Sequence, residues 1–292
     1  MNQITIIFVL ILSGLCFGSF AGASVWRLRA RQLIQDKADG EDYDKNEYKK
    51  LRKIVNKNLV KDRSKCLSCG YMLKWYDMMP LLSWIFLRGK CRKCKVKIGW
   101  LEPLTELGVC LFFILSYLLW PYSLNTILEI TRLIIWLASG VLMAILFAYD
   151  KKWYILPNLA NYLIIFLGVI NSLLIVLSAY NKTTALAEIA GSTLILSGLY
   201  LFLYIVSRGR WIGFGDVKLG FGLALLLADW KLAFIALFAA NFIGCLIVVP
   251  AMIIGKLNRN SHVPFGPLLI TGTILAGLFG SCLVNMFFYT LV

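Results

Sequence analysis

Two aspartates stand at the edges of long apolar runs, Asp150 in "LFAYDKKWYILPN" and Asp216 in "GFGDVKL". Ionisable side chains at membrane depth are costly, so they usually have a function or a partner. Two neighbouring carboxylates share a proton, so one can act as a base toward water and the other as an acid toward a carbonyl. Gly213 and Gly215 remove side chains beside Asp216, which would let a substrate backbone approach. This pattern favours an aspartyl hydrolase.

Other charged residues near the apolar runs leave alternatives open. Lys218 is predicted to anchor the chain at the inner membrane face, although a local Asp216–Lys218 pair is an alternative. Glu106, in the inner third of the second apolar run, could bind a substrate or make a capping or interhelical hydrogen bond. A proton-coupled transporter would also need acidic groups, but typically near the bilayer midplane and in repeated halves. The chain has one histidine, so catalytic triads that contain histidine are nearly excluded.

Four cysteines between the first two apolar runs have the spacing of a metal site. They form two C-x2-C pairs separated by 21 residues: Cys66, Cys69, Cys91 and Cys94. Each pair can direct two thiolates at one ion from a tight turn, and two such turns complete a tetrahedral site suited to structural zinc. A redox C-x2-C is the alternative, but it needs only a single pair. The charged stretch 33–62 predicts an exposed helix or a linker.

The composition is that of a membrane protein with one soluble insert. The chain has 292 residues, of which 60% are hydrophobic, whereas soluble domains have roughly 45–50%. Residues 27–97 hold 20 of the 30 Lys and Arg and 8 of the 15 Asp and Glu. Cytoplasmic loops rich in Lys and Arg, which also attract anionic lipid, explain the net charge of +15. The sequence has no motif typical of nucleic-acid binding, so we expect no nucleic-acid partner.

Eight apolar runs predict an all-α, polytopic membrane protein with about eight transmembrane helices. The runs are residues 4–26, 103–120, 127–148, 155–178, 184–206, 217–228, 232–255 and 266–290. Placing the N-terminus outside puts the basic loops inside the cell at every crossing, as the positive-inside rule requires. The chain thus divides into a first transmembrane helix (1–26), a cytoplasmic zinc-binding insert (27–102) and a membrane core of about seven helices (103–292). The sixth run is too short to span a bilayer unless neighbouring helices bury its ends or the bilayer thins locally.

Motifs along nearly the whole chain resemble those of bacterial prepilin peptidases, the type IV leader peptidases of the GxGD class of membrane aspartyl proteases. In order, they are "GLCFGSF" (14–20), "RL" (27–28), "PLLSWIFLRGKCRKCK" (80–95), "EPLTE" (102–106), "YDKKWYILPN" (149–158), "GFGDVKL" (213–219) and "PFGPLL" (264–269). The GxGD motif alone is weak, but its combination with the cysteine spacing and the membrane pattern is specific. The first apolar run departs from the family pattern, because Gly22 with Ala23 and Arg29 stand where an Asn and a Pro are usual.

The resemblance implies that Asp150 and Asp216 are the catalytic aspartates and that the four cysteines are the family's metal site. It also implies an endopeptidase of the bacterial inner membrane that removes a basic leader from prepilin or pseudopilin substrates of type IV pilus and secretion systems. Cleavage would occur at the cytoplasmic face. Many family members also methylate the new N-terminus with S-adenosylmethionine, so an N-methyltransferase activity is a second expectation. A transporter with a metal-stabilised cytoplasmic domain and a non-catalytic assembly scaffold are the alternatives.

Overall fold

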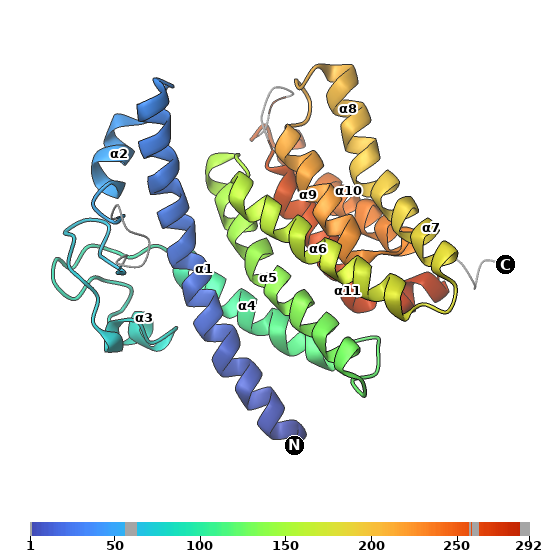
Figure 1. Cartoon of the computed structure of the whole chain (residues 1–292). Coiled ribbons are helices and arrows are strands. Elements are labelled where there is room, and N and C mark those ends of the chain that lie inside the picture. The colour runs from blue at the N-terminus through green and yellow to red at the C-terminus, as the bar shows by residue number, and fades with distance from the viewer. Residues whose placement is uncertain (1, 56–62, 257, 259–262, 287–292) are drawn as a thin grey trace. The chain divides into compact units, whose positions relative to one another are not determined.

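The computed structural model describes residues 2–55, 63–256, 258 and 263–286, and its regular structure is helical (Figure 1). The α-helices are α1 (Gln3–Asp39), α2 (Lys45–Leu51), α3 (Leu82–Phe86), α4 (Leu101–Leu118), α5 (Ile127–Trp153), α6 (Asn158–Ser178), α7 (Lys182–Thr193), α8 (Leu199–Ser207), α9 (Phe214–Leu227), α10 (Trp230–Ile253) and α11 (Phe265–Val284). A 3-10 turn covers Trp75–Asp77, and a π-helical turn, Leu194–Gly198, joins α7 to α8. The described residues contain two isolated β-bridges and no strand, which confirms the all-α prediction.

Six helical stretches are long and apolar enough to cross a membrane. Within the described residues they are α1, α4, α5, α6, the continuous stretch Lys182–Ser207 and α10. The other two expected spans correspond to α9, which has 14 residues, and to α11, whose apolar part, Phe265–Gly280, is also shorter. Length and composition therefore indicate a multi-pass membrane protein, while the expected number of eight spans is not confirmed.

The chain forms two compact units, Met1–Ile114 and Leu115–Val292. In the first unit, α1 does not end near residue 26, where the sequence places the end of the first span, but continues to Asp39. Arg29 lies inside this helix. The helix ends at Gly40, whose φ of 76° lies in the left-handed region that glycine adopts without steric cost.

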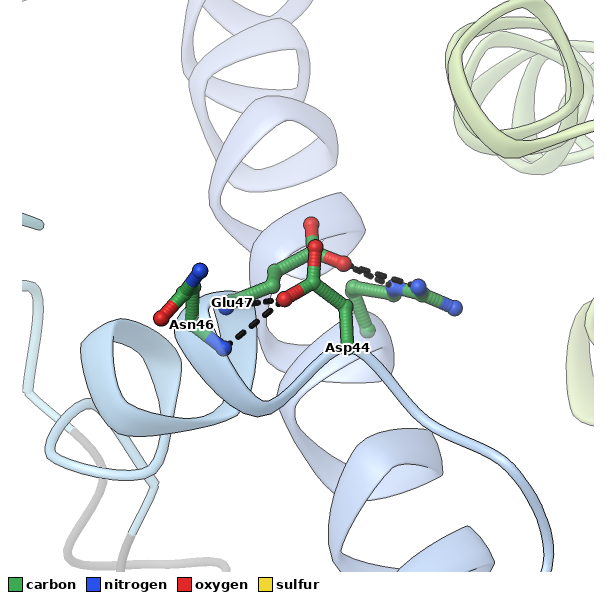
Figure 2. Close-up of polar contacts among 4 residues, drawn as sticks. Asp44, Asn46 and Glu47 are labelled. Atoms are coloured by element: carbon green, nitrogen blue, oxygen red, sulfur yellow. Dashed lines mark hydrogen bonds and ion pairs between the residues drawn. The ribbon is translucent and has the colours of Figure 1, made fainter.

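The charged segment that follows α1 packs back on it through α2. Asp44 caps α2 by accepting hydrogen bonds from the backbone amides of Asn46 and Glu47, at 2.8 and 3.0 Å (Figure 2). The Glu47 carboxylate accepts two hydrogen bonds from the Arg29 guanidinium of α1, at 2.9 and 2.7 Å. The two backbone hydrogen bonds lower the pKa of Asp44 because they favour its charged form. The cap is therefore intact at neutral pH and is lost only as the pH falls through this lowered pKa.

A small apolar cluster also joins α1 to α2. Its buried members are Ala30, Leu33, Leu51 and Ile54. The sequence predicts an exposed helix or a linker over residues 33–62, but the described part of this stretch contributes to a core because its few apolar side chains meet on one side of α1. Residues 56–62 lie outside the described residues.

In the first unit, α1 and α4 approach closely because glycines recur on α1 every four residues. A Cβ at Gly14 would lie 2.8 Å from the Cα of Cys110, and a Cβ at Gly18 would lie 2.5 Å from the Cα of Glu106. Small residues at this spacing commonly allow the backbones of transmembrane helices to come together. The close approach places the first turns of α4, with Glu102 and Glu106, beside α1.

α9 is short for a membrane span because neighbouring helices of the second unit bury it. The last carbonyls of a helix have no amide partner within it, and here side chains of α6 donate to two of them. Ser172 donates to the carbonyl of Leu225 at 2.9 Å, and Asn171 donates to that of Leu226 at 3.0 Å. Ser192 of α7 adds a hydrogen bond to the carbonyl of Ala224 at 2.8 Å. Of the two explanations for the short sixth run, this packing supports burial by neighbouring helices.

We expect Gly222→Val to force α6 and α9 apart and to lower the stability of the second unit. A Cβ at Gly222 would lie 2.7 Å from Cγ2 of Ile164 and 3.1 Å from the backbone nitrogen of Ile165. Overpacking of this kind typically costs about 1–3 kcal/mol, so the thermal unfolding midpoint of the detergent-purified protein should fall. Gly108→Val on α4 is the matched control, because no atom lies within 4 Å of a Cβ there. Equal midpoints for the two variants would contradict this account of the packing.

Candidate active site and metal centre

Asp150 lies in the last turn of α5, a helix that begins with a capping box between Thr126 and Glu129 and ends at Trp153. Asp150 is 5% exposed. Its Oδ2 accepts a hydrogen bond from the backbone N–H of Gly266 at 3.0 Å. A Cβ on Gly266 would lie 2.8 Å from the same oxygen, so the absence of a side chain allows α11 to approach this carboxylate.

Asp216 lies in the first turn of α9, whose N-cap is Gly213. It is half-buried, and its carboxylate interacts electrostatically with that of Asp150. α11 packs against both α5 and α9, so a segment distant in sequence contacts both helices that carry the aspartates. The structure thus brings into proximity the two carboxylates that the sequence predicts as a dyad.

The two glycines of the GxGD motif have different surroundings. Gly213 is exposed, and a Cβ there would lie 3.5 Å from Oδ2 of Asp216, so this side of the carboxylate is open. Gly215 faces α6 and the segment before it: a Cβ at this position would lie 3.2 Å from Cβ of Leu156. The Gly215 carbonyl accepts a hydrogen bond from Nδ2 of Asn161 at 3.3 Å. Gly213 is therefore the glycine that leaves room beside Asp216.

Sequence reasoning missed two residues that support the aspartates. Asn161 is fully buried on α6, where it holds the backbone just before Asp216, and the Gly266 amide reaches Asp150 from α11. The one local signal for Asn161 is an amide side chain within an apolar helix, where an unpaired polar group is costly. No local signal connects Gly266 with α5, because the contact depends on how α11 packs.

Two further predicted site residues have partners of their own. Lys218 donates from Nζ to Oδ1 of Asn158 at 2.8 Å and lies over two aromatic rings. Its ammonium group is thus bound to an amide at the start of α6. Glu106, which is 6% exposed, accepts a hydrogen bond from the backbone N–H of Leu81 in the insert, at 2.7 Å. Glu106 therefore makes a structural hydrogen bond, which is the role that the sequence left open as the alternative to substrate binding.

The four cysteines of the insert meet in the first unit. The sulfur atoms of Cys66, Cys69, Cys91 and Cys94 all lie within 4.8 Å of one another. The Sγ atoms of Cys66 and Cys94 are 3.8 Å apart, which is about the edge of a regular tetrahedron with Zn–S distances of about 2.3 Å. The cluster therefore has a geometry that could bind a zinc ion.

Two equivalent turns present these cysteines. The N–H of Cys66 donates to the carbonyl of Tyr71, and the N–H of Cys91 donates to that of Val96, both at 2.9 Å. An isolated antiparallel bridge closes each turn. The matching backbones explain how each C-x2-C pair directs two sulfur atoms to the same point.

The thiols of the two turns have different surroundings. Burial raises the pKa of Cys66 to about 12. Around Cys91, the effect of burial is outweighed by hydrogen bonds from the backbone amides of Cys94 and Lys93, and the pKa is lowered to about 7. Because zinc binds thiolates, metal binding at this cluster would release protons.

Comparison with known proteins gives matches over nearly the whole chain. Residues 12–120 match the family model described as the Bacterial Peptidase A24 N-terminal domain. The chain is 30% identical over 267 residues to the "Type 4 prepilin-like proteins leader peptide-processing enzyme" of Escherichia coli O78:H11, a match that covers 89% of each chain. It is 27% identical over 272 residues to the "Prepilin leader peptidase/N-methyltransferase" of Pseudomonas aeruginosa, which covers 92% of this chain and 89% of the relative. No solved structure gives a significant match.

Proposed function

Because this chain belongs to the family of type IV prepilin leader peptidases, we propose that it removes the leader peptide from prepilin-like proteins through a dyad of Asp150 and Asp216. The observation that supports the dyad is the electrostatic influence of Asp150, at the end of α5, on Asp216, at the start of α9. The family relationship leaves the transporter and the assembly scaffold without support.

In the proposed mechanism the two carboxylates share one proton. The ionised carboxylate takes a proton from water, whose oxygen attacks the scissile carbonyl, while the protonated carboxyl donates to the carbonyl oxygen. The C–N bond then breaks, and the leaving amine takes up a proton. The Gly266 N–H fixes the orientation of Asp150, and the open side of Asp216, next to exposed Gly213, is where the substrate would approach.

The supporting residues are given roles that follow from their contacts. Gly213 admits the substrate backbone beside the dyad, and Gly215 holds the start of α9 in place through its bond to Asn161. Lys218 anchors the start of α9 through Asn158 and does not need to touch the substrate. Glu106 positions the insert by accepting the Leu81 N–H.

The orientation in the membrane is proposed from the distribution of basic residues. The insert is strongly basic, Lys151 and Lys152 follow Asp150, and Arg208 and Arg210 precede Asp216. The positive-inside rule therefore favours a cytoplasmic insert and a dyad at the cytoplasmic face of the inner membrane, with the N-terminus outside. The lipid bilayer and prepilin or pseudopilin substrates are the partners that this arrangement requires.

Two groups are assigned to this chain as cofactors. Zinc would be held by the four cysteines and would be structural, because four protein ligands leave no open position for a substrate. The relatives from Pseudomonas aeruginosa and Bacillus subtilis are named N-methyltransferases as well as peptidases. S-adenosylmethionine would supply a methyl group to the new amino terminus.

Incubation of the purified full-length protein in lipid nanodiscs with a prepilin-like substrate tests this function. We expect mass spectrometry to find a new N-terminus just before the hydrophobic helix of the substrate, and a methyl group on it when S-adenosylmethionine is present. An intact leader after prolonged incubation would contradict the peptidase. A cleaved but unmodified N-terminus would contradict only the methyltransferase.

A further inference from the structure

The first unit contains a cavity of about 470 Å³ that the peptidase mechanism does not use. α1, the insert and the first turns of α4 line it. Its lining residues include Trp26, Met78, Trp84, Glu102 and Glu106. Sites for small organic ligands typically have volumes of about 300–1,000 Å³ and combine apolar or aromatic walls with a few well-placed polar groups. This cavity has both properties.

Two carboxylates, one helical turn apart on α4, line the cavity. Trp26 donates from Nε1 to Oε1 of Glu102 at 2.9 Å. Oε2 of Glu102 is buried and has no hydrogen-bond partner in the described part of the chain, whereas Glu106 is bound to the Leu81 amide. A buried carboxylate oxygen without a partner is costly unless a ligand brings a donor or a positive charge to it. The α4 wall of the cavity is therefore suited to a cationic group.

Basic side chains line the cavity on α1 and the insert. They are Arg27, Lys65, Arg92 and Lys97. Arg92 is neutralised by Asp77 at 2.7 Å, which leaves the other three to attract an anionic group. A small ligand with charges of both signs fits these walls, whereas a uniformly basic leader segment would meet like charges.

Trp84 supplies a second polar atom without a partner. Its Nε1–H is buried and has no acceptor among the residues described. The Trp84 ring packs on that of Trp100, with 4.6 Å between the ring centroids. A fixed indole offers a face to a planar ring or a cation, and its N–H can donate to a ring nitrogen or a carboxylate. The expected ligand thus has a planar ring, hydrogen-bond acceptors and a positive charge.

From these residues we propose that the cavity binds S-adenosylmethionine, with its sulfonium and ammonium groups facing Glu102 and Glu106. The proposal rests on the methyltransferase part of the proposed function. The ligand also carries a carboxylate for the basic wall and a planar adenine for the indole of Trp84. In the transfer, the C–S bond breaks and leaves its electron pair on sulfur, an N–C bond forms at the amine, and the nitrogen releases one proton to water.

Calorimetric titration of the detergent-purified full-length protein tests this site. S-adenosylmethionine and S-adenosylhomocysteine are titrated separately, because the second compound lacks the positive charge on sulfur and reports on the other contacts. We expect Glu102→Gln to weaken binding of S-adenosylmethionine about tenfold or more. The loss for S-adenosylhomocysteine should be smaller.

Two more variants make the result specific. Glu188→Gln is the matched control. This glutamate lies on α7 in the second unit and also has a buried carboxylate oxygen without a partner among the described residues. Its replacement should leave the affinities for both compounds unchanged. Trp84→Phe keeps an aromatic ring in the cavity but makes it smaller, and it removes an N–H that has no acceptor among the described residues. We expect it to fold and to bind both compounds about two- to tenfold more weakly.

Leader cleavage is measured on the same preparations, so that the two proposals can fail separately. A protein that cleaves but binds no S-adenosylmethionine would overturn this inference and leave the peptidase intact. Unchanged affinity in both cavity variants would place the ligand elsewhere and overturn the site. Binding of a basic leader peptide that depends on Glu102, without binding of S-adenosylmethionine, would make the cavity a leader site and also overturn the inference.

Discussion

Asp150→Asn and Asp216→Asn should each abolish leader cleavage while the protein stays folded and inserted. Each change replaces a carboxyl group by an amide of the same shape, which cannot exchange a proton with water or with the scissile carbonyl. General acid or base catalysis typically contributes about 10²–10⁴-fold. The dyad needs both groups in one step, so we expect cleavage to slow by at least about a thousandfold. Single-turnover cleavage in nanodiscs, followed by mass spectrometry of the N-terminus, measures this loss.

The structure offers a matched control for the dyad in the same unit. Asp229 caps α10 by accepting hydrogen bonds from the amides of Lys231 and Leu232, at 2.7 and 3.4 Å. Asn caps a helix about as well as Asp, so Asp229→Asn should stay folded and active. In Asp150→Asn the amide oxygen can still accept the Gly266 N–H, so the unfolding midpoint should change little. Full-rate cleavage by either dyad variant would exclude the dyad.

The double change Cys66→Ser and Cys69→Ser should remove the metal ion and unfold the insert. The described part of the insert between α2 and α4 has little regular structure beyond α3, which has five residues. Such a segment depends on its metal, and structural zinc contributes on the order of 10 kcal/mol to the folding of small zinc domains. Elemental analysis should show about one zinc per wild-type chain and almost none in the variant. Limited proteolysis should then cut the variant within the insert.

Cys245→Ser with Cys282→Ser is the control for this change. Both cysteines are exposed and lie outside the four-cysteine cluster. This double variant should keep its zinc and its protease resistance. Zinc retained by the Cys66 and Cys69 variant would show that other ligands hold the metal, and a wild-type protein without zinc would contradict the metal assignment altogether.

The helical fold and the membrane setting could be predicted because they depend on local patterns. Long apolar runs form helices wherever the bilayer leaves no other partner for the backbone. The sequence predicts that the first transmembrane segment ends at residue 26, where the hydropathy falls, but this fall marks the end of the apolar stretch and not the end of the helix. Nothing between Trp26 and Asp39 breaks a helix, so α1 continues until Gly40 ends it.

The short sixth run shows a limit of the same reasoning. Its length could be read from the sequence, but the reason for it could not. Asn171 and Ser172 on α6 satisfy two of the last carbonyls of α9, and neither residue carries a local sign that it faces another helix. Hydrogen bonds between helices depend on packing, and packing depends on all the residues at the contact.

The sequence by itself determined the chemistry that is available: two aspartates at the ends of apolar runs, and four cysteines whose spacing suits one metal ion. These features are local, because a C-x2-C turn and a GxGD motif each lie within a few residues. Only the tertiary structure decided which groups meet. It placed the Gly266 amide on Asp150, brought Asp216 near that carboxylate, and left one oxygen of Glu102, in a cavity, without a partner among the described residues. Such contacts join helices that are far apart in the chain, so their close packing, and not the local pattern, sets them.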